Sequence, residues 1–391
     1  MNDADEDRAS TAGATAGNAP GREEMVMGFM RLPVAPAVSD ASVEGFMNAV
    51  PADRRALLRG GAGLGLAAAL AGFAGKVSAQ DEHPTPPGET VGSDPQAPST
   101  GDASPVPAGT AEFKLYDPWL APVEAGDKDI TVAAVDATVY VANDVPYAAW
   151  TFDGSVPGRP LRVREGDMVN FTFKVDASAS TAHSLDTHAA KTPPEVNYRT
   201  IMPGEEFTWQ FPATTAGAFM YHCGTPPVLM HIGAGMYGAM IVDPKDGWSP
   251  AQELVFVQSD FYLKEGESGI MVPDYTKMLG HGAADFVCFN GYANQYVENP
   301  IEIKVGEPVR IFVMNAGPNV WASFHVVGAI FDKAYVNANP ANELRGLQSI
   351  TIGPGDGACV EFTVEEPGEY VAVNHAFGHA AHGAIAILSA K

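Results

Sequence analysis

Two segments of this chain, far apart in sequence, repeat one alternating pattern, and this repeat limits the possible folds most strongly. Residues 161–175 read LRVREGDMVNFTFKV and residues 301–315 read IEIKVGEPVRIFVMN. In both segments apolar and polar residues alternate, as they do in strands with one buried face. The glycine at position 166 aligns with Gly306. The repeat therefore predicts two copies of one β-domain.

The flanking segments extend the repeat in the same order. The aligned pairs are FDG at 152–154 with FNG at 289–291, PGEEFTWQF at 203–211 with PGDGACVEF at 354–362, and HIGAGMYGAMIV at 231–242 with HAAHGAIAIL at 379–388. Short strands separated by turn signals are typical of Greek-key sandwiches and barrels. We therefore expect an all-β chain with two Greek-key domains, at about 112–245 and 250–391. No long helix is required, and residues 274–281 are expected to form a short helical turn.

The segment before residue 112 has a different character. Residues 80–111 are rich in Pro, Gly, Ser, Thr and Asp, a composition typical of a disordered leader. Before it, Arg54 and Arg55 precede a Gly/Ala/Leu run that ends in VSA at Ala79. This run is short for a membrane anchor. We expect residues 1–79 to be an extended N-terminus with a cleavable twin-arginine signal, and the mature protein to be periplasmic or otherwise extracytoplasmic.

The charge and the cysteines narrow the possible partners. The chain carries 47 Asp and Glu against 23 Lys and Arg, a formal charge of −24. Such a chain offers no basic surface for nucleic acid and favours basic protein partners. Its three cysteines form no disulfide framework. Cys288 and Cys359 lack any ligand pattern, so we expect them to be buried core thiols.

The third cysteine lies in a pattern of metal ligands. Cys223 is followed by His231 and Met236 in YHCGTPPVLMHIGAGM, whereas the second copy has only VNHAFGHAAH at this place. A thiolate, two imidazoles and a weak thioether are the ligands of type 1 copper, and methionine is a poor ligand for zinc. His183, in TAHSLDTH, offers the second imidazole. The first domain is therefore predicted to hold type 1 copper.

A second metal site is predicted beside the first. Adjacent residues of a strand point to opposite faces, so His222 points away from the site that Cys223 enters. His188 follows His183 by five residues and can reach the same outer face. A third ligand must come from the second domain, which offers His325, His375, His379 and His382.

These motifs resemble those of one enzyme family. HSLDTH, YHCGTPPVLMHIGAGMYG, SFHVVG and VNHAFGHAAHGAIAIL together resemble the copper-containing nitrite reductases, which have two cupredoxin domains and form nitric oxide. The spacing after the cysteine is similar to the shorter-loop branch of that family. The resemblance implies type 1 copper on His183, Cys223, His231 and Met236, and type 2 copper on His188, His222 and His375. It also implies a homotrimer in which His375 comes from a neighbouring subunit.

The resemblance further implies a mechanism. Nitrite binds at the type 2 copper and is reduced by one electron to nitric oxide and water. Asp186 and His325 handle protons, and Val327 crowds the metal and orients the substrate. The electron donor is a small cupredoxin or a cytochrome c. The resemblance assigns no role to His379 or His382, and either remains open as a group assisting the type 2 site.

Two other functions are compatible with a copper-binding β-protein. A two-domain multicopper oxidase needs about eight histidines, typically in His-x-His and His-Cys-His motifs, and this chain has neither motif. A cupredoxin electron carrier without a catalytic centre would hold one copper per chain instead of two. In such a carrier His188, His222 and His375 would be surface residues that bind no common metal.

Overall fold

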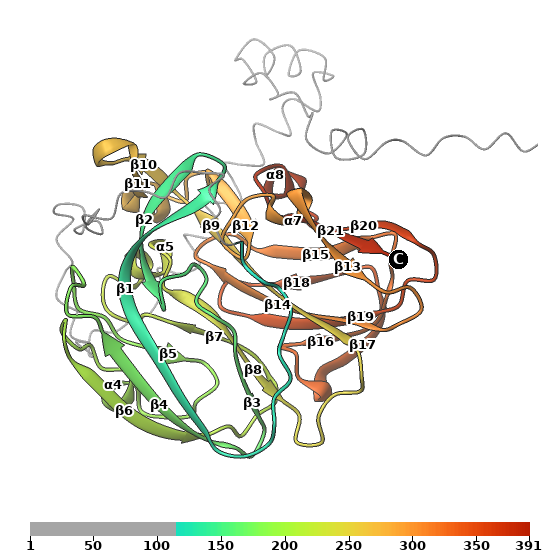
Figure 1. Ribbon diagram of the computed structural model, residues 1–391, viewed down its shortest axis with the longest axis horizontal. Helices are drawn as coiled ribbons and strands as arrows, with labels where there is room; N and C mark the ends of the chain where they lie inside the picture. The colour runs from blue at the N-terminus through green and yellow to red at the C-terminus, as the bar shows by residue number, and fades with distance from the viewer. Residues whose placement is uncertain (1–114) are drawn as a thin grey trace, which may run out of the picture. The chain divides into compact units, whose positions relative to one another are not determined.

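The computed structural model describes residues 115–391. In this part the chain consists mainly of strands arranged in four sheets, so the predicted all-β class is confirmed (Figure 1). The predicted signal at 1–79 lies outside the described residues, as does the leader at 80–111. None of the helices within 115–391 has the length and apolar character needed to cross a membrane.

Residues from the first half of the described chain form two sheets. The larger has the spatial order β10 (Leu263–Glu265), β11 (Met271–Pro273), β2 (Val145–Phe152), β1 (Lys128–Ala142), β4 (Met168–Val175) and β6 (Glu206–Pro212). The smaller has the order β3 (Leu161–Arg164), β8 (Tyr237–Asp243), β7 (Gly217–His222) and β5 (Asp186–Thr187). The edge strand β10 and its neighbour β11 are thus supplied by residues 263–273 of the second half, and the other strands of both sheets come from the first half.

Residues from the second half form the other two sheets. One has the order β12 (Phe286–Phe289), β9 (Gln252–Phe261), β14 (Val309–Gly317), β19 (Gly357–Phe362), β16 (Phe331–Val336) and β17 (Glu343–Leu347). The other has the order β13 (Asn299–Ile303), β21 (Ile385–Ala390), β20 (Gly368–Asn374), β15 (Ala322–Val327) and β18 (Ser349–Ile352). In Figure 1 the first-half strands run from teal to yellow-green and the second-half strands from yellow to red.

Helices in the described part are short and lie in connections. They are α4 (Pro194–Asn197), α5 (Val228–Gly233), α6 (Tyr275–Leu279), α7 (Gln295–Glu298) and α8 (Phe377–Ala381), with 3₁₀ turns η1 (Glu267–Gly269) and η2 (Pro340–Asn342). The helical turn predicted at 274–281 is α6, which Asp274 begins by accepting a hydrogen bond from the Lys277 backbone. Two of these helices, α5 and α8, occupy equivalent places before the last strand of each half.

The internal repeat is visible in the backbone. The aligned glycines Gly166 and Gly306 both have positive φ, at 102° and 75°. The glycines of FDG and FNG, Gly154 and Gly291, have φ of 79° and 80°. These are turn conformations that glycine adopts at little cost. The two halves therefore use the same turns at the same places in the repeat.

An apolar cluster joins strands of both halves. It contains side chains of β7 and β8 together with those of β9, β14 and β19. Cys288 and Cys359 belong to it and are fully buried, as predicted. The backbones of the two halves come close together, since a Cβ added to Gly357 would lie 2.4 Å from the Ala218 carbonyl oxygen. The two halves are therefore packed as one unit.

Candidate metal centres

The four predicted type 1 ligands come from a short helix and from residues beside strands of the first half. His183 precedes β5, Cys223 directly follows β7, His231 lies in α5, and Met236 directly precedes β8. All four are buried, with exposed fractions of 3% or less. Backbone hydrogen bonds join them, since Met236 N–H donates to the His231 carbonyl and Cys223 N–H donates to the Met236 carbonyl.

Three donor atoms of this group face one another. His183 Nδ1 lies 3.1 Å from His231 Nδ1, and Cys223 Sγ lies 3.3 Å from His231 Nδ1 and 3.9 Å from His183 Nδ1. A metal with bonds of about 2.0 Å to nitrogen and 2.3 Å to sulfur holds its ligand atoms at separations of this size. The donor set and its spacing therefore fit a copper ion.

The surroundings favour ligation over proton binding. Burial lowers the pKa of His183 to about 3, with a further contribution from His231, and burial lowers the pKa of His231 to about 4. Both imidazoles are neutral at physiological pH, which is the form that binds metals. Burial raises the pKa of the Cys223 thiol, although the Ser184 backbone N–H donates to its sulfur at 3.4 Å. A bound cation reverses that effect, because a coordinating thiol loses its proton.

Trp150 covers the first centre, and the sequence analysis did not identify it. Its ring lies 4.5 Å from the His231 ring, centroid to centroid, and contacts the His183 ring edge-on at 5.4 Å. Its indole N–H donates to Ser180 Oγ at 3.0 Å, which fixes the ring. A bulky aromatic two residues before FDG is a signal in the sequence. Only the pairing of β2 with the loop of α5 shows which side chains it covers.

The second cluster lies on the other side of β7. In the register of β5 and β7, Asp186 pairs with His222, so HSLDTH is brought beside YHC. His188 Nε2 lies 3.2 Å from His222 Nε2, and the two rings are perpendicular at 89°. Asp186 Oδ2 lies 3.9 Å from His222 Nε2. These three side chains have ligand atoms within 4.8 Å of one another.

Backbone carbonyls orient both imidazoles of this cluster. His222 Nδ1 lies 3.0 Å from the Cys223 carbonyl oxygen and donates to it. His188 makes a hydrogen bond to the Gly355 backbone, which raises its pKa, although partial burial and the nearby His222 lower that pKa overall. His222 thus presents Nε2 as its unprotonated nitrogen, the arrangement that second-shell acceptors impose on metal ligands, and His188 Nε2 faces it. The pair fits two positions of a copper site.

Among the described residues, the chain does not bring His375 to this pair within 4.8 Å. His375 follows β20 and is exposed. Its ring lies 5.5 Å from the ring of His325, whose Nδ1 contacts the Gln348 carbonyl. Val327 lies on the same strand as His325, and its strand partner is Val371. The predicted second-half residues therefore gather together, apart from the first-half pair.

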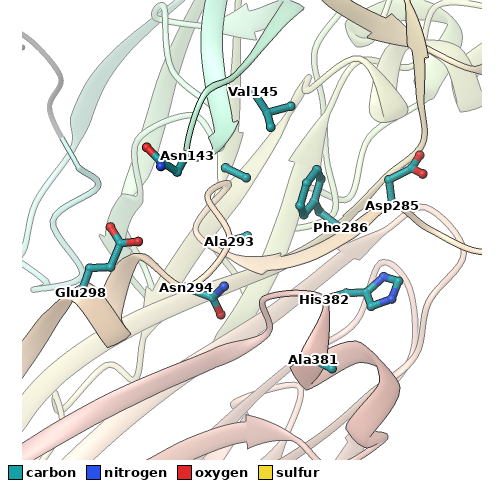
Figure 2. A pocket seen from close by; sticks show the side chains of 10 residues that line it. Asn143, Val145, Asp285, Phe286, Ala293, Asn294, Glu298, Ala381 and His382 are labelled. Atoms are coloured by element: carbon teal, nitrogen blue, oxygen red, sulfur yellow. The ribbon is translucent and has the colours of Figure 1, made fainter. Parts of the chain in front are cut away.

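The two histidines left open have separate surroundings. His379, in α8, has its Nδ1 3.4 Å from the amide nitrogen of Asn374. Burial lowers the pKa of His379, and the nearby His382 lowers it further. His382 donates through Nδ1 to the Ala284 carbonyl at 3.0 Å. It lines a cavity of about 330 Å³ with Asp285, Phe286 and Asn294 (Figure 2). None of the predicted ligands lines this cavity.

Comparisons with known proteins find relatives that contain copper. The family profile of the multicopper oxidases matches residues 134–247. A copper-containing nitrite reductase of Neisseria meningitidis is 39% identical over 272 residues, covering 67% of this chain and 70% of the relative. The solved copper nitrite reductase from Nitrosomonas europaea has a TM-score of 0.63 and 38% identity, covering 68% of this chain and 94% of that one. The corresponding enzyme from Thermus scotoductus has a TM-score of 0.63 and 32% identity, covering 68% and 62%.

Proposed function

Because this chain belongs to the copper-containing nitrite reductases, we infer that it reduces nitrite to nitric oxide and water. The reaction consumes one electron and two protons for each nitrite. The site must therefore receive electrons singly, bind a small anion and deliver protons. The observation that carries the proposal is the pair of donor clusters on opposite sides of the Cys223–His222 link.

We propose one type 1 and one type 2 copper per subunit. The type 1 ligands are His183, Cys223, His231 and Met236, and the type 2 ligands are His188, His222 and His375. Copper supplies a one-electron couple at both centres and, at the second, an open position for an anion. The mutually facing donor atoms of His183, Cys223 and His231 support the first assignment. The Nε2 atoms of His188 and His222 face each other at 3.2 Å, which supports the second assignment.

The residues of the first centre hold its ligands and exclude water. The ligands are buried, and the Trp150 ring covers both imidazoles. Packing of this kind keeps the ligands in one arrangement as the charge of the centre changes, so little reorganisation accompanies each electron. The two ligand sets are joined through the peptide bond between Cys223 and His222. With copper bound at both sets, this link would provide a short covalent path for an electron between them.

Asp186 is the proposed proton donor nearest the second centre. Its carboxylate lies beside His222 and is partly exposed, so it can exchange protons with solvent and face an anion bound there. His325 is the second proposed proton-handling group, held through Nδ1 at the Gln348 carbonyl. Val327, on the same strand as His325, is the proposed apolar wall of the nitrite pocket.

Assembly would bring the two halves of the second centre together. We propose a homotrimer in which His375 and His325 of one subunit face His188 and His222 of its neighbour. Within the described residues of one chain no third imidazole lies within 4.8 Å of the first-half pair. In the second half His375 is exposed and His325 is partly buried. A heterologous interface that repeats around a three-fold axis closes into a ring and completes three equal sites.

The cellular setting follows from the sequence and remains a proposal. We propose export of the folded protein by the twin-arginine route to the periplasm, where it takes part in denitrification. The donor is proposed to be a small cupredoxin or a cytochrome c. The formal charge of −24 favours a donor with a basic surface, because opposite charges speed encounter.

Multicopper oxidase activity is less well supported, although that family's profile matches the first half. The whole sequence has no His-x-His or His-Cys-His motif, which trinuclear copper sites use. Within the described residues, the three-ligand clusters are the two already described.

Copper stoichiometry combined with EPR tests the proposal. We expect two coppers per mature chain, one giving a small hyperfine splitting and one a large splitting. Addition of nitrite should shift only the large-splitting signal. One copper per chain with a signal that nitrite does not change would leave an electron carrier and contradict the enzyme assignment.

A further inference from the structure

Asn374, the residue before His375, is a fully buried amide at the end of β20. Its Nδ2 donates to Gln258 Oε1 at 2.9 Å and to the Trp321 carbonyl at 3.0 Å. Its Oδ1 accepts from the backbone N–H of Ser323 at 3.1 Å and of Ala376 at 3.2 Å. A buried amide with all of these bonds is held in one orientation.

Hydrogen bonds of Asn374 and of its partner Ser323 hold the backbone on both sides of His375. The bond from Ala376 N–H to Asn374 Oδ1 closes a turn whose middle residue is His375. Asparagine side chains form such turns with the backbone two residues ahead. The His375 N–H itself donates to the Ser323 carbonyl at 2.7 Å, and Ser323 also donates to Asn374. The Asn374 side chain thus helps to set the backbone of an otherwise exposed residue.

The amide is anchored to the interior of the second half. Gln258 Nε2 donates to Asn315 Oδ1 at 3.3 Å, and Asn315 Nδ2 donates to the Val320 and Ile352 carbonyls. Both Gln258 and Asn315 are fully buried. The network is neutral and connects strands β9, β14 and β20. It therefore holds the end of β20 without burying an unpaired charge.

Asn374 occupies the place in the second half that Cys223 occupies in the first. The backbone N–H of Ser184 donates to Cys223 Sγ, and that of Ser323 donates to Asn374 Oδ1. Cys223 N–H donates to the Met236 carbonyl, and Asn374 N–H donates to the Ala384 carbonyl.

The histidines of α5 and α8 correspond in the same way. His231 Nδ1 lies 3.3 Å from Cys223 Sγ, and His379 Nδ1 lies 3.4 Å from Asn374 Nδ2. The places of His183 and Met236 are taken by Ala322 and Ala384, as the strand register and the backbone hydrogen bonds show. An amide thus stands where the first half has its thiolate ligand, and it bonds to the backbone.

We propose that Asn374 is a positioning residue for His375: its side chain sets the direction in which His375 presents its imidazole to the type 2 copper. The proposal rests on the assignment of His375 as a ligand. Groups that orient a metal ligand without touching the metal change metal affinity by about 10–100-fold. The role is therefore measurable as copper binding, independently of turnover.

The test compares Asn374→Ala with Asn290→Ala in the assembled, copper-loaded protein. Asn290 is a matched control because it is buried in the same half and its side chain bonds to Val255, Val257 and Tyr296, away from Asn374. We expect Asn374→Ala to weaken type 2 copper binding about 10–100-fold in chelator competition. Type 1 copper should stay at one per chain. Asn290→Ala should leave the type 2 affinity unchanged.

The Asp variants extend the comparison if an Ala variant does not fold. Asn374→Asp keeps both accepted bonds and should lose less type 2 affinity than Asn374→Ala, but more than Asn290→Asp. Equal losses at positions 374 and 290, or no loss at 374, would overturn the positioning role. His375→Ala separates the two proposals. If it leaves the type 2 affinity unchanged, the ligand assignment falls and the positioning role with it. If only His375→Ala loses copper, the positioning role alone falls.

Discussion

At the scale of single residues, the second cluster combines a carboxylate and an imidazole that differ in their exposure to solvent. Asp186 and His222 are paired across β5 and β7, yet the carboxylate is partly open while the imidazole is buried. A carboxyl group in contact with both solvent and the site can receive a proton and pass it on. A buried imidazole fixed by the Cys223 carbonyl is suited to ligation instead.

Replacement of the proton donor should separate proton delivery from metal binding. We expect Asp186→Asn to lower kcat/KM for nitrite by about 10²–10⁴-fold, the usual contribution of a general acid. Copper content should stay at two per chain. The measurement is steady-state turnover with copper analysis, with the exposed carboxylate variant Glu206→Gln as control. Loss of the type 2 copper in Asp186→Asn would show instead that the carboxylate is a ligand.

The first centre should make the copper-free protein sensitive to acid. In the unfolded chain the imidazoles of His183 and His231 have pKa values of about 6.5. In the folded chain these pKa values are about 3 and about 4, respectively. Between these values the unfolded chain binds protons at both positions and the folded chain does not. The free energy of unfolding should therefore fall as pH falls below 6.5, by up to about 1.4 kcal/mol per pH unit for each group.

Urea denaturation of the copper-free protein at several pH values measures this slope. The double variant His183→Asn, His231→Asn should have a shallower dependence over the same range. An unchanged slope in the double variant would show that other groups cause the acid sensitivity.

At the scale of elements, the strand β7 organises both centres. Its last residue, His222, faces the second cluster, and the next residue, Cys223, enters the first. The strand is packed closely on both sides. A Cβ added to Gly238 on the paired strand β8 would lie 2.3 Å from Cζ of Tyr221, a ring that is fully buried. Glycine at this position is therefore required by the place of the ring.

Filling that space should destabilise the strand and disturb its neighbour. We expect Gly238→Ala to lower the free energy of unfolding by about 1–3 kcal/mol, the usual cost of overpacking. Tyr221 directly precedes His222 on β7, so a shift of its ring and backbone should also weaken type 2 copper binding. Gly378→Ala is the control, because a Cβ there meets nothing within 4 Å. It should change stability by no more than about 0.5 kcal/mol. Equal effects of the two variants in chemical denaturation would contradict the packing argument.

At the scale of the whole molecule, we propose that assembly completes the second centre, because the described part of one chain keeps the histidines of its two halves apart. The first half presents two imidazoles whose Nε2 atoms face each other, and the second half presents His325 and His375 as a neighbouring pair. The amide network behind His375 holds that pair in place before any partner arrives. Such preorganisation lowers the entropy lost when subunits assemble.

Mixed oligomers test whether the centre is shared between chains. His188→Ala and His375→Ala should each be inactive alone. When the two are unfolded, mixed equally and reassembled, about one quarter of the interfaces should pair an intact His188 with an intact His375 in a ring of heterologous contacts. Activity should recover to about that fraction of the wild-type value. No recovery in oligomers shown by mass to be mixed would place both ligands in one chain.

Much of this protein could be predicted from its sequence. The alternating segments and their aligned glycines predicted an all-β chain with a repeat, because strand periodicity and positive φ are local properties. The spacing of Cys223, His231 and Met236 predicted a compact ligand set, since all three lie close together at the end of one strand and its loop.

Contacts between distant segments were decided only by the tertiary structure. The register of β5 with β7 brings His188 to His222, and carbonyls of Cys223 and Gly355 direct their nitrogens. Burial, which no local pattern specifies, sets the pKa of His183. Nothing in the local sequence around Asn374 indicates its role. Its distant partners come from two other segments, at residue 258 and at residues 321–323, and hydrogen bonds between such segments form only when the whole chain is folded.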